Sequence, residues 1–300
     1  MNKPSKIEKQ VKKKTNWLLR IVWFVLLLVI TYLTLIKYVD VQLAKRTYTD
    51  VYQECSKVWA TRGLVAEQTE EINNVQNLDN RDRSGVNSIS SIQAAFDAGA
   101  RGSEVDLFFD VKMDRYIISH NYPYFLKDGE LLTLEKLLME TGGNNYYWID
   151  FKKLRHLNEQ EAKQAVSRLE AIVNNTNLKK WIYIEGADPI NLSLYSKAGF
   201  NTLFDVHPMP ESKPLTSFVA NVYKAIYYFG DFTVMGMKYG EEADPVYGKT
   251  MRKVLGNIPV FIYHAPDNKV LLKNLSKEPQ VRVILNRDDT VNHYLVNNCE

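Results

Sequence analysis

The sequence predicts an α/β protein in which a (β/α)8 barrel of the TIM type follows a single transmembrane helix. Two observations carry this prediction. From residue 57 onward, eight short apolar runs alternate with eight helix-like stretches, which is the pattern of a closed parallel barrel. Ahead of them lies an apolar segment of 20 residues, long enough to span a hydrocarbon core.

The apolar runs expected to form strands are short and are bounded by polar or turn residues. They cover residues 57–61, 103–109, 146–151, 181–184, 202–206, 232–237, 259–264 and 281–285. Helices are expected between and after them, over residues 88–98, 133–141, 158–175, 190–197, 214–228, 246–256, 268–276 and 290–298. An open doubly wound sheet is the alternative. It would usually carry a glycine-rich phosphate loop after its first strand, and ATRGLVAEQ is not such a loop.

The amino-terminal segment is strongly basic. Residues 1–20 hold six lysines and Arg20 against Glu8, a net +6, so the overall +3 leaves −3 on the rest of the chain. A mildly acidic body argues against nucleic acid as a partner. The apolar run Trp17–Ile36 follows the lysines, and no small-x-small cleavage site follows the run. We therefore expect an uncleaved signal anchor with its basic end in the cytoplasm and the remainder exported.

These features divide the chain into four expected segments. Residues 1–16 form a basic cytoplasmic tail, 17–39 a transmembrane signal anchor, 40–54 a helical stalk and 55–300 the barrel. The protein would then be single-pass, with its barrel on the periplasmic or extracellular face. Both cysteines lie near the ends of the exported part, so a Cys55–Cys299 disulfide is possible, with two unpaired thiols as the alternative.

Residues 64–87 are polar and charged, and they show no periodicity. This is long for a first strand-to-helix loop. In a barrel it would lie on the carboxyl face. Two interpretations stay open, a lid over the barrel mouth and a disordered segment.

Residues 102–121, GSEVDLFFDVKMDRYIISHN, place two carboxylates on one strand and a histidine after a turn. Side chains alternate along a strand, so Glu104 and Asp106 face the same way. DVKMD is typical of a turn, and a hairpin in which residue 109 faces residue 115 sets His120 opposite Glu104. Adjacent carboxylates repel unless they share a cation, and oxygen ligands suit Mg²⁺ or Ca²⁺. The stretch thus predicts a divalent-metal site beside a histidine, against the alternative of a charged edge strand.

Two other predicted strands end in further polar groups. Asp150 and Lys152 lie on one face of WIDFKK, so Asp150 is expected to complete an acidic triad with Glu104 and Asp106. Lys152 is placed for an anionic substrate oxygen, and Arg62, after the first strand, offers forked donors to a phosphate. Metal-binding acids, phosphate-binding cations and a proton-transferring histidine together indicate phosphoryl chemistry. All fall at the carboxyl ends of strands, where barrel enzymes carry their chemistry.

These residues resemble a known signature. WATRG followed by NSISSIQAAFDAGARGSEVDLFFDVKMDRYIISHN is similar to that of the glycerophosphodiester phosphodiesterases, and LTLEKLL and IDFK resemble the helix and strand that follow it. The likeness covers residues 57–153. WAT and ISHNYP…LTLEKLL…IDFKKL are also similar to menorin-like proteins of the same phospholipase-C-like phosphodiesterase superfamily. The resemblance implies a TIM barrel that hydrolyses phosphodiesters.

The resemblance also implies a role for each candidate residue. The metal ligands would be Glu104, Asp106 and Asp150, the phosphate contacts Arg62 and Lys152, and one of two acid–base histidines His120. The catalytic set is then His120, Arg62 and Lys152. The family's other histidine is replaced by Thr61, which can hydrogen-bond a substrate but cannot exchange a proton near neutral pH.

The loss of one acid–base histidine would lower the rate by about 10²–10⁴-fold. His207 and His264 both end predicted strands, so either is a candidate to replace it. We therefore expect a membrane-anchored, metal-dependent phosphodiesterase that acts on glycerophosphodiesters or related lipid phosphodiesters. A catalytically impaired protein that binds a phosphodiester or lipid head group as a sensor or scaffold is the main alternative. A structural envelope protein is a third.

Overall fold

The computed structural model describes residues 6–64, 85–127, 129–174, 178–286 and 293–294. The chain divides into two compact units, Met1–Arg46 and Thr47–Glu300. Residues 64–87, for which a lid and a disordered segment are both open, and the predicted last helix at 290–298 lie largely outside the described residues.

The first unit is one long helix, α1 (Lys6–Leu43). Its segment Leu19–Leu43, 25 residues long, is apolar enough to cross a membrane, and none of its most apolar window is buried. An uncovered apolar surface of this length is unlike a helix of a soluble core. By length and composition the segment is a candidate membrane span, and a signal sequence passes the same test.

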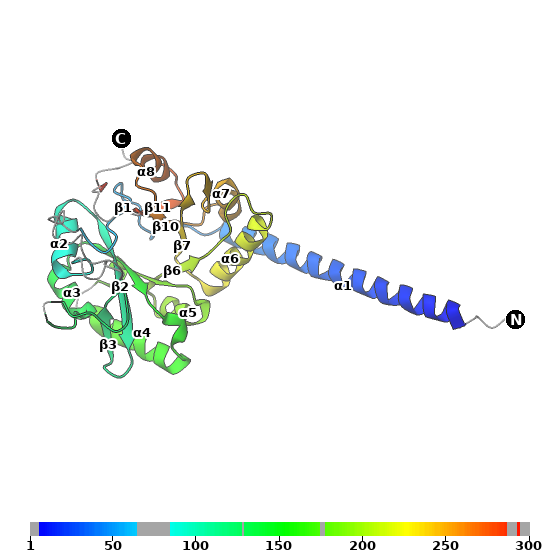
Figure 1. The fold of residues 1–300 in the computed structure, drawn as a ribbon, viewed down its shortest axis with the longest axis horizontal. Helices are drawn as coiled ribbons and strands as arrows, with labels where there is room; N and C mark the ends of the chain where they lie inside the picture. The colour runs from blue at the N-terminus through cyan, green and yellow to red at the C-terminus, as the bar shows by residue number, and fades with distance from the viewer. Residues whose placement is uncertain (1–5, 65–84, 128, 175–177, 287–292, 295–300) are drawn as a thin grey trace, which may run out of the picture. The chain divides into compact units, whose positions relative to one another are not determined.

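The second unit is built on parallel strands that close into a barrel (Figure 1). The eight barrel strands are β1 (Val58–Trp59), β2 (Gly102–Asp110), β4 (Tyr146–Phe151), β5 (Ile182–Gly186), β6 (Asn201–Val206), β7 (Val234–Lys238), β10 (Val260–Ala265) and β11 (Val281–Asn286). Neighbours follow the order β1-β11-β10-β7-β6-β5-β4-β2. The ring closes at Ala60, just after β1, which bridges Ser103 of β2 in parallel. The predicted (β/α)8 fold is confirmed.

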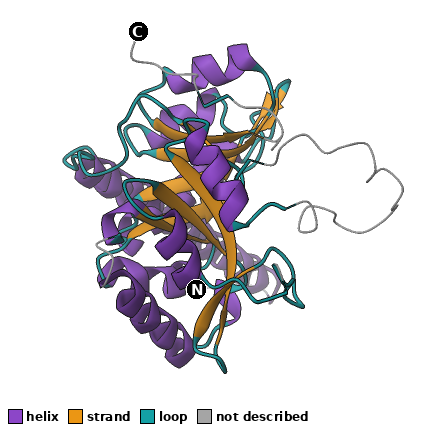
Figure 2. Cartoon of the chain, turned by 90° about the vertical axis from the view of Figure 1, so that its left-hand side faces the viewer, coloured by secondary structure: helices purple, strands orange, loops and turns teal. Residues whose placement is uncertain are grey.

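Helices separate successive barrel strands and surround them, as Figure 2 shows in purple around the orange strands. They are α2 (Ile89–Asp97), α3 (Leu134–Thr141), α4 (Glu159–Asn174), α5 (Pro189–Lys197), α6 (Thr216–Gly230), α7 (Lys249–Leu255) and α8 (Lys269–Ser276). Short 3-10 helices lie at Leu154–His156 and Lys179–Trp181. Four of the α-helices begin at side chains that accept hydrogen bonds from their first turn, namely Ser88, Thr133, Asp188 and Asn268.

A ninth strand, β3 (Arg115–Ile118), pairs with β2 in the predicted antiparallel hairpin. Its register differs by one residue from the prediction, because Phe109 faces Tyr116 and not residue 115. His120 is therefore not opposite Glu104, as predicted. Asp114 adopts a positive φ of 51°, so the turn runs from 111 to 114 and joins the pair Asp110 and Arg115. A small hairpin of β8 (Gly240–Glu241) and β9 (Asp244–Pro245) precedes α7.

The inside of the barrel is filled by large side chains from most of its strands. The buried cluster contains Trp59, Trp148, Tyr183, Leu203, Val234, Phe261, Val283 and Leu285. Val51 and Tyr52 belong to the same cluster, and the backbone N–H of Tyr52 donates to the Tyr183 hydroxyl at 3.0 Å. The part of the predicted stalk that follows Leu43 is thus not helical, and residues 51–52 are packed into the barrel.

Cys55 lies just before β1 and is disulfide-bonded. No free cysteine occurs in the part of the chain that the structure describes. Cys299, its predicted partner, lies outside that part, so the pairing of Cys55 with Cys299 stays a prediction.

Candidate functional site

A cavity of about 440 Å³ opens at the carboxyl ends of the barrel strands. Its position follows from the fold, because parallel strands all end on one face and their last side chains converge there. All seven residues of the predicted site line this cavity: Thr61, Arg62, Glu104, Asp106, His120, Asp150 and Lys152. The fold therefore brings together side chains that are up to 91 positions apart in the sequence, from Thr61 to Lys152.

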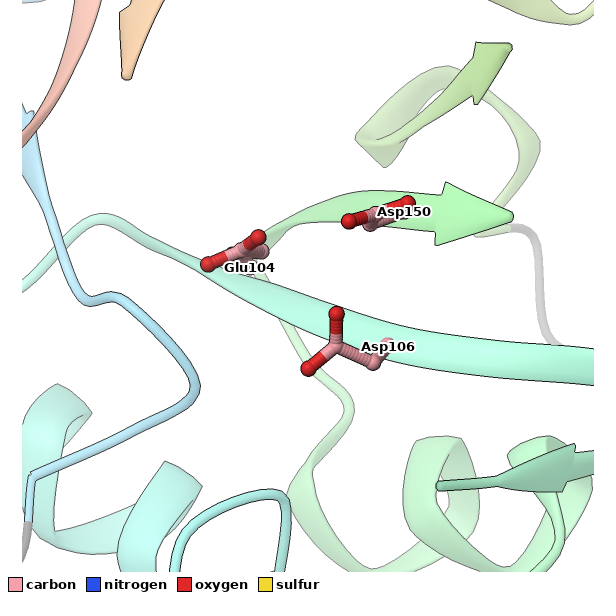
Figure 3. A group of neighbouring side chains, drawn as sticks. All are labelled: Glu104, Asp106 and Asp150. Carbon is pink, nitrogen blue, oxygen red and sulfur yellow. The ribbon is translucent and has the colours of Figure 1, made fainter. Parts of the chain in front are cut away.

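The acidic side chains form a compact cluster. Glu104 and Asp106 lie on β2, and Asp150 lies on the adjacent β4, directly paired with Asp106 in the sheet register. Figure 3 shows the three carboxylates pointing toward a common space. One oxygen of each lies within 4.8 Å of the others. Three hard oxygen donors at this spacing fit a divalent cation such as Mg²⁺ or Ca²⁺.

Two cationic side chains, Lys152 and Arg62, compensate part of this negative charge. Lys152 Nζ lies 2.7 Å from Asp106 Oδ1 and forms an ion pair with Asp150. Arg62 Nε lies 3.8 Å from Asp106 Oδ2, and both of these side chains are almost fully buried. Asp106 is thus the best-compensated acid of the cluster, while Glu104 has no ion pair among the described residues.

The pKa values of the three acids follow this uneven distribution of compensating charge. Burial alone would raise the pKa of Asp106, but Lys152 and Arg62 hold that pKa below its ordinary value. Burial, together with the charges of Asp106 and Asp150, raises the pKa of Glu104 well above its ordinary value. Burial likewise raises the pKa of Asp150 despite the nearby Lys152. An additional cation would relieve the repulsion at Glu104 and Asp150, so the donor set fits a metal ion electrostatically as well as geometrically.

Asn87 holds Asp106 in place. Its Nδ2 donates to Asp106 Oδ2 at 2.7 Å, and its Oδ1 accepts from the Asp106 backbone N–H at 3.1 Å. Asn87 is fully buried and adopts a positive φ of 53°, a conformation that Asn tolerates better than most residues. It immediately precedes Ser88, the cap of α2, so the start of that helix fixes a residue of the acidic cluster.

His120 reaches the cavity from the segment that follows β3 rather than from a strand position opposite Glu104. It is half-buried, its Nδ1 lies 3.2 Å from Asn121 Oδ1, and its charge contributes to the lowered pKa of Asp106. His120 thus lines the same cavity as the acids, as predicted, but from the segment after β3 and not from the predicted strand position.

Two further acids of the cavity were not predicted. Glu185 of β5 and Asp205 of β6 also line it, so five carboxylic acids and two permanent cations line the described cavity wall. Glu185 accepts from Trp148 Nε1 at 2.5 Å, and Asp205 accepts from the Tyr263 hydroxyl at 3.1 Å. The sequence could have indicated both acids, because WIYIEG and TLFDV each have an acid near the end of an apolar run, as WIDF does.

These acids are also protonated more readily than usual. Burial raises the pKa of Asp205 from 3.8 to about 7, although His207 and Tyr263 partly oppose the shift. Burial and the charges of Asp150 and Asp205 raise the pKa of Glu185 well above its ordinary value. A second cavity of about 300 Å³ shares Asp150, Lys152, Glu185 and Asp205 with the first and continues over the loops after β4 and β5. Asp150, Glu185 and Asp205 therefore line both cavities.

The two candidate replacement histidines differ in position. His264, at the end of β10, lines the cavity. His207 follows β6, has a side chain that is 70% exposed, and places its Nδ1 3.5 Å from Asp205 Oδ2. His207 is outside the described lining of the cavity. The geometry therefore favours His264.

The fold is that of the glycerophosphodiester phosphodiesterases. No protein-family model and no curated protein matches the chain. Among solved structures, one of these enzymes from Parabacteroides distasonis is 18% identical, with 78% of this chain and 94% of that chain covered and a TM-score of 0.53. A putative one from Galdieria sulphuraria is 14% identical, with 80% and 96% covered and a TM-score of 0.54. One from Thermotoga maritima is 13% identical, with 79% and 96% covered and a TM-score of 0.52.

Proposed function

We propose that this protein is a membrane-anchored, metal-dependent phosphodiesterase that hydrolyses glycerophosphodiesters or related lipid phosphodiesters. The observation that carries the proposal is one cavity that combines a three-carboxylate cluster with Arg62, Lys152 and His120. The fold shared with glycerophosphodiester phosphodiesterases supports the reaction class.

The proposed roles follow from charge and position. Glu104, Asp106 and Asp150 would hold one Mg²⁺ or Ca²⁺, which would supply Lewis-acid stabilisation of negative charge on a phosphoryl oxygen. Arg62 and Lys152 bind the remaining anionic oxygens, and Thr61 offers a hydroxyl to the substrate.

His120 is the imidazole of the predicted set, and imidazole is the side chain that most often transfers protons in acid–base catalysis. It is half-buried at the wall of the cavity, next to the segment that carries the acids. We assign it the removal of the proton from the attacking hydroxyl.

The anchor belongs to the same proposal. Residues 17–39 would hold the protein in the bilayer, with the basic tail 1–16 in the cytoplasm and the barrel exported. Protease added to cells from which any outer membrane and wall have been removed would then digest the barrel and leave the tail protected. A protected barrel would contradict this orientation.

The test of activity uses the full-length protein in detergent micelles with a glycerophosphodiester and either Mg²⁺, Ca²⁺ or a chelator. We expect metal-dependent release of the alcohol, and a loss of at least about 10²-fold in Asp106→Asn. Asp97→Asn, the same change on the exposed face of α2, serves as the matched control. Turnover that is unaffected by Asp106→Asn would contradict the proposed site.

A second candidate function rests on Thr61. It lines the cavity at the position where the resemblance places a histidine, so binding without efficient turnover is the outcome that this substitution favours. The protein would then be a sensor or scaffold for a phosphodiester or lipid head group. Metal-dependent binding of a glycerophosphodiester without hydrolysis, measured by calorimetry, would support it.

A further inference from the structure

Two imidazoles line the described wall of the cavity, and they come from different parts of the barrel. His120 follows the hairpin of β2 and β3, whereas His264 lies at the end of β10. In the ring of strands, β1 and β11 separate β2 from β10. The acidic cluster and Arg62 share the cavity with both histidines. A substrate phosphate bound at these groups would therefore meet an imidazole on each of two walls.

We infer that His264 is the general acid that protonates the leaving alcohol, with His120 as the base. This inference rests on the proposed phosphodiesterase function and names a further catalytic residue for it. Cleavage of an alkyl phosphodiester needs both roles, because an alkoxide is a poor leaving group unless it gains a proton.

The end of β10, where His264 lines the cavity, is irregular. In a regular strand consecutive side chains point to opposite faces, so neighbours do not both line one space. Tyr263 and His264 nevertheless both line the cavity. The register between β10 and β11 shifts between Ile262 and Ala265, and His264 has a positive φ of 50°. This irregularity ends the alternation, as β-bulges beside active sites do when they redirect a side chain.

The positive φ is itself unfavourable for a residue with a side chain. A left-handed residue other than glycine is strained and persists where the surrounding structure requires it. Arg62, with φ 61°, is a second non-glycine residue of the cavity in this conformation. Both lie at the carboxyl ends of barrel strands and both present a polar side chain to the same cavity.

The exposure of His264 suits an acid. Its side chain is exposed, whereas His120 is half-buried, so His264 can regain a proton from water after each turnover. The charged or titratable groups that line the cavity on its side are Tyr263 on its own strand, Asp205 of β6 and Glu185 of β5. The Tyr263 hydroxyl donates a hydrogen bond to the Asp205 carboxylate at 3.1 Å.

The proposed step balances without another reactant. A hydroxyl, from water or from the substrate itself, attacks phosphorus as His120 accepts its proton, and a new P–O bond forms. The P–O bond to the leaving alcohol breaks, and its electron pair takes the proton of the His264 imidazolium. The alcohol leaves neutral, His264 ends neutral and His120 ends protonated. Exchange with water restores both.

The test compares two substrates of the full-length protein in micelles, an alkyl glycerophosphodiester and its p-nitrophenyl counterpart. Nitrophenolate leaves without a proton. His264→Asn should therefore lower kcat on the alkyl diester by about 10²–10⁴-fold and on the nitrophenyl diester by less than about tenfold. Asparagine tolerates a positive φ, so the backbone is preserved. His207→Gln is the matched control and should leave both rates unchanged.

A second variant separates chemistry from structure. His264→Gly also accepts the positive φ and leaves space for added imidazole, which should restore turnover of the alkyl diester. Equal loss on both substrates, or no loss on either, would overturn the assignment while leaving the phosphodiesterase function in place. Lack of turnover of both diesters by the wild-type protein would contradict the proposed function itself, and this inference with it.

Discussion

Replacing Glu104 with glutamine should have opposite effects on the metal-free and metal-bound protein. Without metal, burial and the neighbouring acids raise the pKa of Glu104 well above its ordinary value. A raised pKa means that the folded state binds this proton more tightly than the unfolded chain, so stability is lost as the pH rises through the folded pKa. Glutamine has the same shape and no charge. Metal-free Glu104→Gln should thus equal the wild type at low pH and exceed it in stability at pH 8.

With metal bound, we expect the wild type to be more stable than Glu104→Gln. At a free metal concentration of 100 times Kd, binding stabilises the wild type by about 2.7 kcal/mol. For a unit the size of Thr47–Glu300, 1 kcal/mol corresponds to roughly 2–4 °C in Tm, so the expected rise is about 5–10 °C. If the loss of one ligand weakens binding about a hundredfold, the remaining stabilisation is about 0.4 kcal/mol. The rise in Tm then falls to about 1–2 °C.

Thermal unfolding of the full-length protein in micelles, followed by near-UV circular dichroism, measures both effects. Scans at pH 5 and pH 8, each with and without Mg²⁺ or Ca²⁺, give the four values needed. Glu140→Gln, on the exposed surface of α3, controls for the loss of a glutamate charge. A Glu104→Gln protein that keeps the full metal-induced rise would refute the assignment of Glu104 as a ligand.

Changes at three further residues have expected outcomes. Burial raises the pKa of Asp205 from 3.8 to about 7, so the free energy of unfolding should fall as the pH rises through this range, by at most about 4 kcal/mol. Asp205→Asn should flatten this pH dependence, as measured by urea unfolding. Asn87→Gly keeps the positive φ accessible but removes both side-chain hydrogen bonds to Asp106. We expect the free energy of unfolding to fall by about 1–3 kcal/mol. The same variant should weaken Ca²⁺ binding about 10–100-fold in calorimetry, and unchanged affinity would mean that Asn87 does not orient the ligand. Gly102→Ala would place a Cβ 2.5 Å from the Trp59 ring, so the urea midpoint should drop by the equivalent of about 1–3 kcal/mol and recover in part with Trp59→Phe.

The order of strands and helices follows from local patterns in the sequence. An apolar run such as YYWIDF is already a strand by composition and length, and the structure places β4 over the same residues, 146–151. The convergence of Asp150, Lys152 and Arg62 was predictable for the same reason, since these residues end or follow their strands and parallel strands must end on one face. Asp106 lies within β2, and the register of β2 and β4 pairs it with Asp150.

The hairpin register depended on tertiary structure. The positive φ of Asp114 sets the turn length, and a change of one residue in that turn moves every later residue to the other face. His120 lines the cavity only because the chain leaves the strand after Ile118. The involvement of Glu185, Asp205 and His264 likewise depended on the closed barrel, which brings distant strand ends to one cavity.

The sequence by itself therefore determined which elements form, in what order, and which residue types stand at the carboxyl ends of the strands. These properties depend on side-chain periodicity and chain polarity, which are local. Only the tertiary structure decided which of those side chains face the same cavity. Ring closure at Ala60, the register shift before Ala265 and the turn at Asp114 set those directions. Each depends on backbone torsion angles and long-range pairing, which residue patterns do not encode.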